Sequence, residues 1–356
     1  MKKISILIIV LFTLLGVYIW SSNSLNNRKV GQLQKKAATP TPSAKQDYNP
    51  KSFLFVPYWA TDISLEDQRK YDSLYYFALS PGSNGSLLAD EGMSKLEDFT
   101  SVASGQETYL VIKMTDSETA QTIISDSDSV ARLIEETSSI VNKYKFKGIA
   151  LDLEISNFLD SSLTGKINSF VQVFYNKLQD NNVNLHLIIY GDVFYRHRPY
   201  DVSYLARNSD LILVMAYDFH KSIGEPGPNF PLSRGSKYGY DFQQMTDDFL
   251  AVVPSEQLGV IFGMYGYDWS VDEQKRPLNR ARALSLKDIR ESFIDNCSWK
   301  NCTVKRDPLS AETEVNYVDS AYHIVWFEDE GSTQVKKQYL KERGVGLTGY
   351  WVWGYF

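Results

Sequence analysis

The sequence predicts an α/β fold, a (β/α)8 TIM barrel with a small α+β insertion after the seventh strand. Eight apolar runs recur between residues 51 and 356, and amphipathic segments separate most of them. Near-continuous apolar runs are typical of parallel strands that are covered on both faces. An eightfold repeat over about 300 residues favours a closed barrel, in which functional sites gather at the C-terminal ends of the strands.

The N-terminus predicts a signal anchor over residues 1–20. An apolar run over residues 4–20 follows two lysines, Lys2 and Lys3. Such a run is at the short limit for a membrane-spanning helix and exceeds the usual signal-peptide core. No small-residue cleavage pattern follows, so we expect an uncleaved transmembrane helix, with a cleaved signal peptide as the alternative. The two lysines should stay cytoplasmic, which makes this a single-pass cell-membrane protein with an extracellular domain, or a secreted protein after cleavage.

Residues 21–50 predict a disordered linker, because they contain almost no large apolar side chains. Such a segment cannot bury enough surface to fold. We therefore expect the folded domain to cover residues 51–356.

Within that domain, apolar content and periodicity define the elements. Helices are expected over residues 117–144, 162–180 and 328–343. Strands are expected over residues 52–59, 74–79, 108–114, 148–154, 184–190, 211–218, 259–266 and 346–353.

Residues 270–326 break the alternation and predict the insertion. They contain both cysteines of the chain, Cys297 and Cys302. They also contain all but the last residue of a strand-like run at 321–327. Outside the cell these cysteines would close a small disulfide loop, and two free thiols are the alternative.

Composition excludes several classes of function. The net charge is -6, from 37 basic and 43 acidic residues, so no basic field points to nucleic acid. Four histidines without a paired motif give no sign of a catalytic metal. Aromatic residues make up 13% of the chain, which suits rings that stack on sugars but equally an aromatic core. We expect no cofactor, and a monomer.

Two acidic residues end the fourth predicted strand, Asp152 and Glu154. Side chains alternate along a strand, so both project from one face about 6.6–6.8 Å apart, toward the barrel mouth. Mutual repulsion favours protonation of one of them near neutral pH, and a glycosidase needs such a proton donor. In the alternative arrangement both acids face solvent and residues 149, 151 and 153 form the core face.

Four motifs, in chain order, resemble those of glycoside hydrolase family 18, the chitinase-like family, over residues 51–356. The run over 326–329, Lys336 and the closing 346–353 resemble bacterial spore-germination members that act on peptidoglycan. The four motifs are Gly148-Ile-Ala-Leu-Asp-Leu-Glu154, Met215-Ala-Tyr-Asp218, Tyr265-Gly-Tyr-Asp-Trp269 and Gly349-Tyr-Trp351.

The resemblance implies substrate-assisted, retaining hydrolysis of glycans that contain β-linked N-acetylglucosamine (GlcNAc), from peptidoglycan or chitin. Glu154 would be the acid and base, Asp152 would orient the acetamide N–H, and Tyr217 would donate to the acetamide oxygen. Tyr217 as a core tyrosine is the alternative. Further expected substrate contacts are Trp351, Asp218, Met215, Tyr58 and Trp269, with barrel packing open for Trp351 and a structural role open for Asp218.

The chain also departs from the family pattern. Ala150 and Lys147 stand where many chitinases have acids, and Lys113 replaces a small residue of the third strand. Without an inner acid, Asp152 should be ionised more persistently, and Lys113 could pair with it. These departures keep two alternatives open: a lectin-like protein on the same barrel, and a glycosidase that uses two protein carboxylates, with Asp218 or Asp152 as nucleophile.

Overall fold

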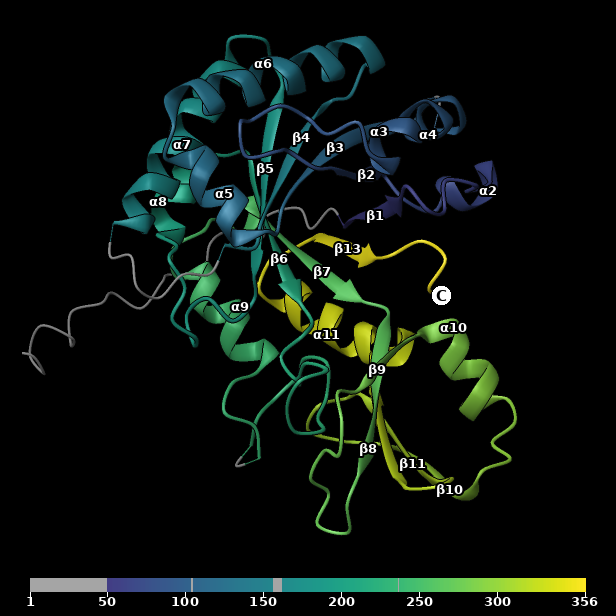
Figure 1. Ribbon diagram of the computed structural model, residues 1–356. Helices are drawn as coiled ribbons and strands as arrows, with labels where there is room; N and C mark the ends of the chain where they lie inside the picture. The colour runs from purple at the N-terminus through teal and green to yellow at the C-terminus, as the bar shows by residue number, and fades with distance from the viewer. Residues whose placement is uncertain (1–49, 104, 156–161, 236) are drawn as a thin grey trace, which may run out of the picture. The chain divides into compact units, whose positions relative to one another are not determined.

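A computed structural model describes residues 50–103, 105–155, 162–235 and 237–356 (Figure 1). The expected anchor over 1–20 lies outside these residues, as does the expected linker up to residue 49. Within the described ranges, no helix is long and apolar enough to cross a membrane.

Eight parallel strands form a closed barrel in the order β1-β13-β7-β6-β5-β4-β3-β2 (Figure 1). The predicted barrel is therefore confirmed. Its strands are β1 Lys51–Pro57, β2 Ser73–Leu79, β3 Glu107–Met114, β4 Gly148–Leu153, β5 Asn184–Tyr190, β6 Leu211–Ala216, β7 Leu258–Gly263 and β13 Leu347–Trp351.

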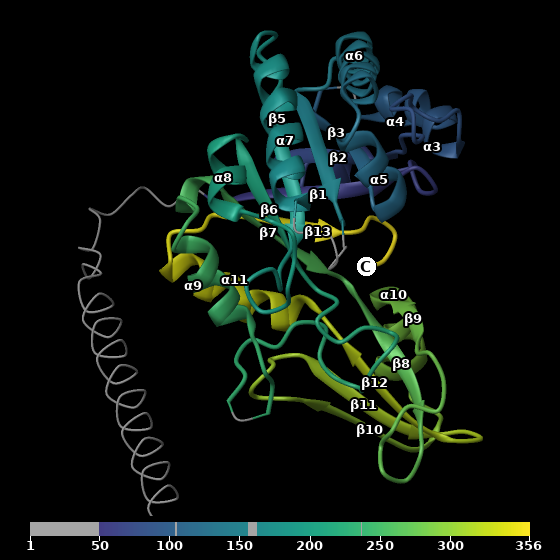
Figure 2. The same cartoon turned by 60° about the vertical axis from the view of Figure 1, so that its left-hand side comes forward.

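Helices connect the strands and cover the outside of the barrel (Figures 1 and 2). The helix expected over 117–144 is two helices, because the Asp126 side chain accepts the Ser129 N–H and caps a new start. The helices are α2 Leu65–Gln68, α3 Glu91–Ser94, α4 Leu96–Val102, α5 Ser117–Ile124, α6 Ser127–Tyr144, α7 Leu163–Gln179, α8 Val202–Arg207, α9 Phe242–Leu250, the 3-10 turn η2 Ser255–Gln257 and α11 Glu330–Glu342.

The insertion forms an antiparallel sheet in the order β10-β11-β12-β8-β9 (Figure 2). It begins at Tyr265, not near 270, because the run expected as one strand over 259–266 leaves the barrel after Gly263. Gly266 permits close pairing with β12, since a Cβ there would lie 2.2 Å from the Trp326 carbonyl oxygen. The elements are β8 Tyr265–Val271, β9 Arg282–Ser285, α10 Leu286–Ile289, the π-helical turn η3 Arg290–Ile294, β10 Lys300–Arg306, β11 Thr313–Val318 and β12 Tyr322–Phe327.

Cys297 and Cys302 form a disulfide in this insertion, with Cα atoms 6.3 Å apart. It closes a short loop that begins before β10, at Cys297, and ends inside that strand, at Cys302.

Side chains alternate between two apolar layers along the barrel strands. One cluster fills the barrel interior, and a larger one lies between the strands and the helices. Gly349 leaves room for the inner layer, because a Cβ there would lie 2.2 Å from the Phe53 ring. The inner cluster includes Phe53, Phe55, Tyr75, Val111, Ala150, Ile188, Leu213, Met215 and Ile261.

Candidate active site

The acidic pair faces the barrel interior. Ala150, which shares a strand face with Asp152, lies in the inner cluster, whereas Leu151 and Leu153 pack in the outer one. Asp152 is 4% exposed, and Glu154 directly follows β4 and is partly exposed. The alternative in which both acids face bulk solvent is therefore wrong.

Burial has the largest effect on the pKa of Glu154. It raises the pKa of this carboxyl, and the charge of Asp218 adds to the rise. A hydrogen-bonding interaction with Tyr190 and the charges of Lys221 and Arg198 oppose it. A raised pKa is the direction that a proton donor needs, and burial, not repulsion from Asp152, is its largest cause.

Asp152 differs from the expectation. Burial and the adjacent Glu154 raise its pKa well above the usual range, and Lys113, which is its register partner on β3, opposes this only in part. Persistent ionisation was therefore the wrong prediction, since it considered the missing acid at Ala150 but not the burial. The Asp152 Oδ1 atom is buried without a hydrogen-bond partner within the described residues. The Asp152 carboxyl can therefore still form a hydrogen bond with a ligand beside Glu154, as an acceptor when ionised or as a donor when protonated.

Tyr200 fixes the backbone on both sides of Glu154. Its hydroxyl donates to the Leu153 carbonyl oxygen at 2.7 Å and accepts the Ile155 N–H at 2.8 Å. Glu154 lies between these two anchored residues, so its direction is set by a side chain that is 45 residues away from Ile155 in the sequence.

Tyr217 and Asp218 follow β6 at the same end of the barrel. Burial raises the pKa of Tyr217 well above its usual value, and the charges of Asp152, Glu154 and Asp218 contribute to the rise. The structure therefore brings Tyr217 together with all three carboxylates.

Asp218 is held in a left-handed backbone conformation, with φ of 59°. Its N–H donates to the Asn229 side-chain oxygen at 2.8 Å, and its Oδ1 accepts the hydroxyls of Tyr267, at 2.8 Å, and Tyr265. A non-glycine residue is uncommon in this conformation. These contacts support a structural role for Asp218, and its Oδ2 makes no hydrogen bond within the described residues.

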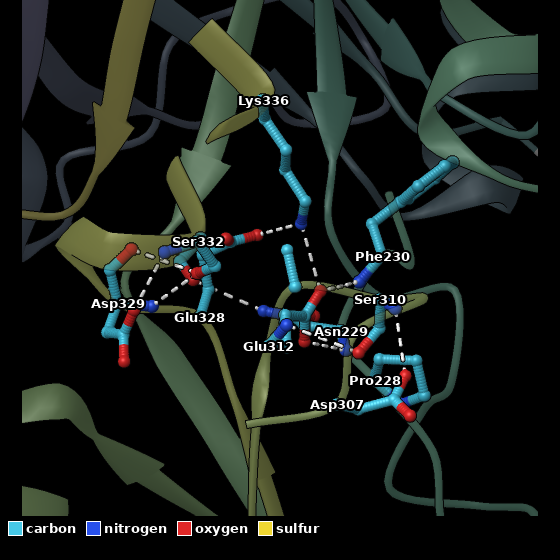
Figure 3. Close-up of polar contacts among 12 residues, drawn as sticks. Pro228, Asn229, Phe230, Asp307, Ser310, Glu312, Glu328, Asp329, Ser332 and Lys336 are labelled. Carbon is cyan, nitrogen blue, oxygen red and sulfur yellow. Dashed lines mark hydrogen bonds and ion pairs between the residues drawn. The ribbon is translucent and has the colours of Figure 1, made fainter. Parts of the chain in front are cut away.

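A buried ionic cluster of Glu312, Glu328 and Lys336 supports Asn229 (Figure 3). All three side chains are fully buried, and Lys336 bridges the two carboxylates, with its Nζ 2.9 Å from the Glu312 Oε1. Glu312 also accepts the backbone N–H groups of Asn229, at 2.5 Å, and Phe230, at 2.8 Å. The cluster thereby ties α11 and the insertion to the loop that holds Asp218.

Aromatic rings line the strand ends near the acids. The Trp351 ring packs edge to face against the Phe77 ring, with centroids 4.5 Å apart, and lies tilted to the Phe55 ring, with centroids 5.5 Å apart. Trp351 is partly exposed. Trp59 is 48% exposed and packs edge to face against Phe77 at 6.3 Å and Tyr58 at 4.9 Å. Trp351 and Trp59 therefore offer ring surface to a sugar.

Two expected substrate contacts are buried. Met215 is 5% exposed and belongs to the inner cluster. The partly buried Tyr217 and Trp351 pack against that cluster. Trp269 is fully buried in the insertion, 5.6 Å from the Tyr267 ring. Because no face of Trp269 is exposed, its assignment as a sugar contact does not fit. It supports Tyr267, which in turn holds Asp218.

The sequence reasoning missed several residues that the structure adds to the site. Phe77 and Tyr190 lie in β2 and β5, and the others lie in loops without a periodic pattern, where only the position of Trp59 after the first strand was a signal. Within the described chain, no group of three or more His, Cys, Asp or Glu residues could hold a metal ion. The missed residues are Trp59, Phe77, Tyr190, Arg198, Tyr200, Lys221 and Asn229.

Comparison with known proteins places these features in context. The model of the glycosyl hydrolases family 18 matches residues 54–355. The cortical fragment-lytic enzyme of Bacillus subtilis is 22% identical over 330 residues, which cover 88% of this chain and 73% of that protein. A Bacillus subtilis protein named as a sporulation-specific glycosylase, YdhD, is 24% identical, and the match covers 66% of this chain and 53% of that one. The chain thus spans about half the length of the latter relative.

Solved structures share the fold. The spore cortex-lytic enzyme SleL of Bacillus cereus gives a TM-score of 0.69 at 19% identity, covering 86% of this chain and 71% of that one. The Group IV chitinase of Ostrinia furnacalis gives a TM-score of 0.75 at 16% identity. The match covers 85% of this chain and 93% of that one.

Proposed function

The chain belongs to the glycosyl hydrolases family 18, and from this membership we propose that it cleaves β-linked GlcNAc glycans by a substrate-assisted, retaining mechanism. One observation carries the proposal. Glu154, with a raised pKa, directly follows β4, two residues after the buried Asp152 on the same strand. A carboxyl that keeps its proton toward neutral pH suits a general acid.

In the first step, the Glu154 proton moves to the glycosidic oxygen as the bond to the anomeric carbon breaks. The acetamide oxygen of the same sugar donates an electron pair to that carbon and closes an oxazolinium ring. In the second step, the Glu154 carboxylate takes a proton from water, whose oxygen attacks the anomeric carbon and reopens the ring. This family is an exception to the scheme with a protein nucleophile.

Other residues would orient and stabilise the acetamide. The free Oδ1 of Asp152 is available to the acetamide N–H. A positive charge developing beside Asp152 favours its ionised form, so it is suited to offset that charge. Tyr217, which is surrounded by the three carboxylates, would donate its O–H to the acetamide oxygen, and Trp351 would stack beneath the ring.

The site argues against both alternative functions. A lectin-like protein has no need for a carboxyl with a raised pKa whose backbone is anchored on both sides, as Tyr200 anchors Glu154. For a two-carboxylate glycosidase, two tyrosine hydroxyls already hold the Oδ1 of Asp218, and burial raises the pKa of Asp152, which disfavours its ionised, nucleophilic form.

We also propose that residues 1–20 anchor the protein in the cell membrane and that the barrel acts outside the cell as a monomer. The apolar run after Lys2 and Lys3 supports the anchor. Relatives named as cortical fragment-lytic and cortex-lytic enzymes favour peptidoglycan over chitin.

The function is tested by incubating the wild-type protein with chitotetraose and with peptide-free peptidoglycan glycan. We expect new reducing ends from at least one glycan, and inhibition by a thiazoline that mimics the cyclised intermediate. Binding of both glycans with no turnover would contradict the proposal and support the lectin alternative.

A further inference from the structure

Two cationic side chains, Arg198 and Lys221, lie beside Glu154, and Arg196 shares the Asp192 carboxylate with Arg198. We call Arg196, Arg198, Lys221 and Asp192 the basic cluster. Asp192 pairs with Arg196 and, at 3.0 Å, with Arg198. With three positive groups and one negative group, the cluster has a formal excess of two positive charges, although the whole chain carries -6.

Arg198 is held rigidly. Its Nε and Nη2 atoms each donate to Asp192 at 3.1 Å, its side chain is 9% exposed, and its guanidinium lies 3.8 Å above the Tyr190 ring. Its Nη1 makes no hydrogen bond within the described chain. A fixed guanidinium with an unused N–H is suited to a planar oxyanion such as a carboxylate.

Lys221 has no ion pair or hydrogen bond in the part of the chain that the structure describes. Its ammonium lies 5.5 Å from the centre of the Tyr190 ring, and the side chain is partly buried. Since a charge removed from water is costly without a partner, this ammonium is suited to an anionic ligand.

Tyr190 joins the basic cluster to the reacting bond. Its ring contacts both Arg198 and Lys221, and its hydroxyl interacts with Glu154. The Tyr190 side chain therefore lies between Glu154 and the two cations Arg198 and Lys221.

Nearby acids cancel only part of this charge. Burial raises the pKa of both Asp152 and Glu154, which favours their neutral forms, and Asp218 adds at most one negative charge against the excess of two in the cluster. This side of the barrel mouth is thus positively charged, and neutral chitin has no group to match it.

We propose that the basic cluster binds a carboxylate carried by the glycan next to the bond that Glu154 protonates, so that acidic GlcNAc glycans are preferred over neutral ones. The inference rests on the proposed function and specifies its substrate class. In peptidoglycan the carboxylate has two sources: the lactyl ether of the sugar, where no peptide is attached, and the attached peptide.

The test measures binding, so that it is independent of turnover. Glu154→Gln protein is titrated calorimetrically with peptide-free GlcNAc–muramic acid tetrasaccharide, with its carboxamide derivative, and with the peptide-bearing form. We expect the carboxylate form to bind about tenfold more tightly than the carboxamide, the range of a charge-assisted hydrogen bond. Tighter binding of only the peptide-bearing form would assign the carboxylate to the peptide.

Adding Lys221→Met should reduce the ratio of the two dissociation constants toward one. The matched control is Lys300→Met, which removes one charge from an exposed lysine on β10 in the insertion. Equal binding of carboxylate and carboxamide glycans, or an equal loss of preference in the Lys300 variant, would overturn the inference. Failure of the wild-type protein to cleave any glycan would instead refute the proposed function and leave the binding ratio to decide this inference.

Discussion

The Glu154→Gln variant should hydrolyse GlcNAc glycans about 10²–10⁴-fold more slowly than wild type, the usual contribution of a general acid. Glutamine keeps the size of the side chain and removes the proton that the leaving oxygen needs. Initial rates of reducing-end release, at saturating substrate, measure the loss in kcat.

The same variant should remain folded. The raised pKa of Glu154 means that its stability contribution is present below the unfolded pKa and is lost as pH rises through the folded pKa. Glutamine removes this dependence, so the variant should melt at least as high as wild type at alkaline pH. Glu256→Gln, at an exposed position in η2, is the control. A loss of activity below tenfold, or an equal loss in the control, would contradict the assignment.

The Lys336→Met variant should lose about 3–5 kcal/mol of unfolding free energy, because it leaves two buried carboxylates without their cation. Lys336 is fully buried between Glu312 and Glu328. Burial already raises the pKa of Glu328 to about 8, and its Oε1 has no hydrogen-bond partner in the described part of the chain. Denaturant unfolding at pH 8 measures the loss.

The destabilisation caused by Lys336→Met should also depend on pH, in a direction that the two carboxyl groups determine. Without Lys336, Glu312 and Glu328 are tolerated best when protonated, so the destabilisation should be smaller at pH 5 than at pH 8. Lys337→Met, which removes a partly buried 3.0 Å contact to the Tyr350 hydroxyl and a cation–π contact to the same ring, should cost about 1 kcal/mol or less. An equal effect of the two substitutions would show that the ionic cluster is not a main source of stability.

The sequence predicted the barrel well because its strands are continuous apolar runs. The fifth strand, expected over 184–190, is found as Asn184–Tyr190. The boundary at Met264 was missed, since the residues on both sides are apolar in the same way and only tertiary pairing separates β7 from β8. Local pattern cannot reveal which sheet a strand joins.

The acids of the site could be predicted because they end a strand, but their surroundings could not. Tyr200 contacts the backbone around Glu154 from the segment between β5 and α8, and Glu312 contacts Asn229 across 83 residues. The ionisation of Asp152 depends on its burial and on Lys113, which a list of residues does not quantify. Long-range contacts of this kind carry no sequence signal in a single chain.

The most direct test of the proposed mechanism compares two aryl β-glycosides that differ only at the second carbon of the sugar, one with an acetamido group and the other with a hydroxyl. If the acetamide of the substrate is the nucleophile, the wild-type protein should release the aryl group from the first glycoside, with retained configuration, and not from the second. Comparable cleavage of both would show that a protein carboxylate is the nucleophile, and would contradict the mechanism.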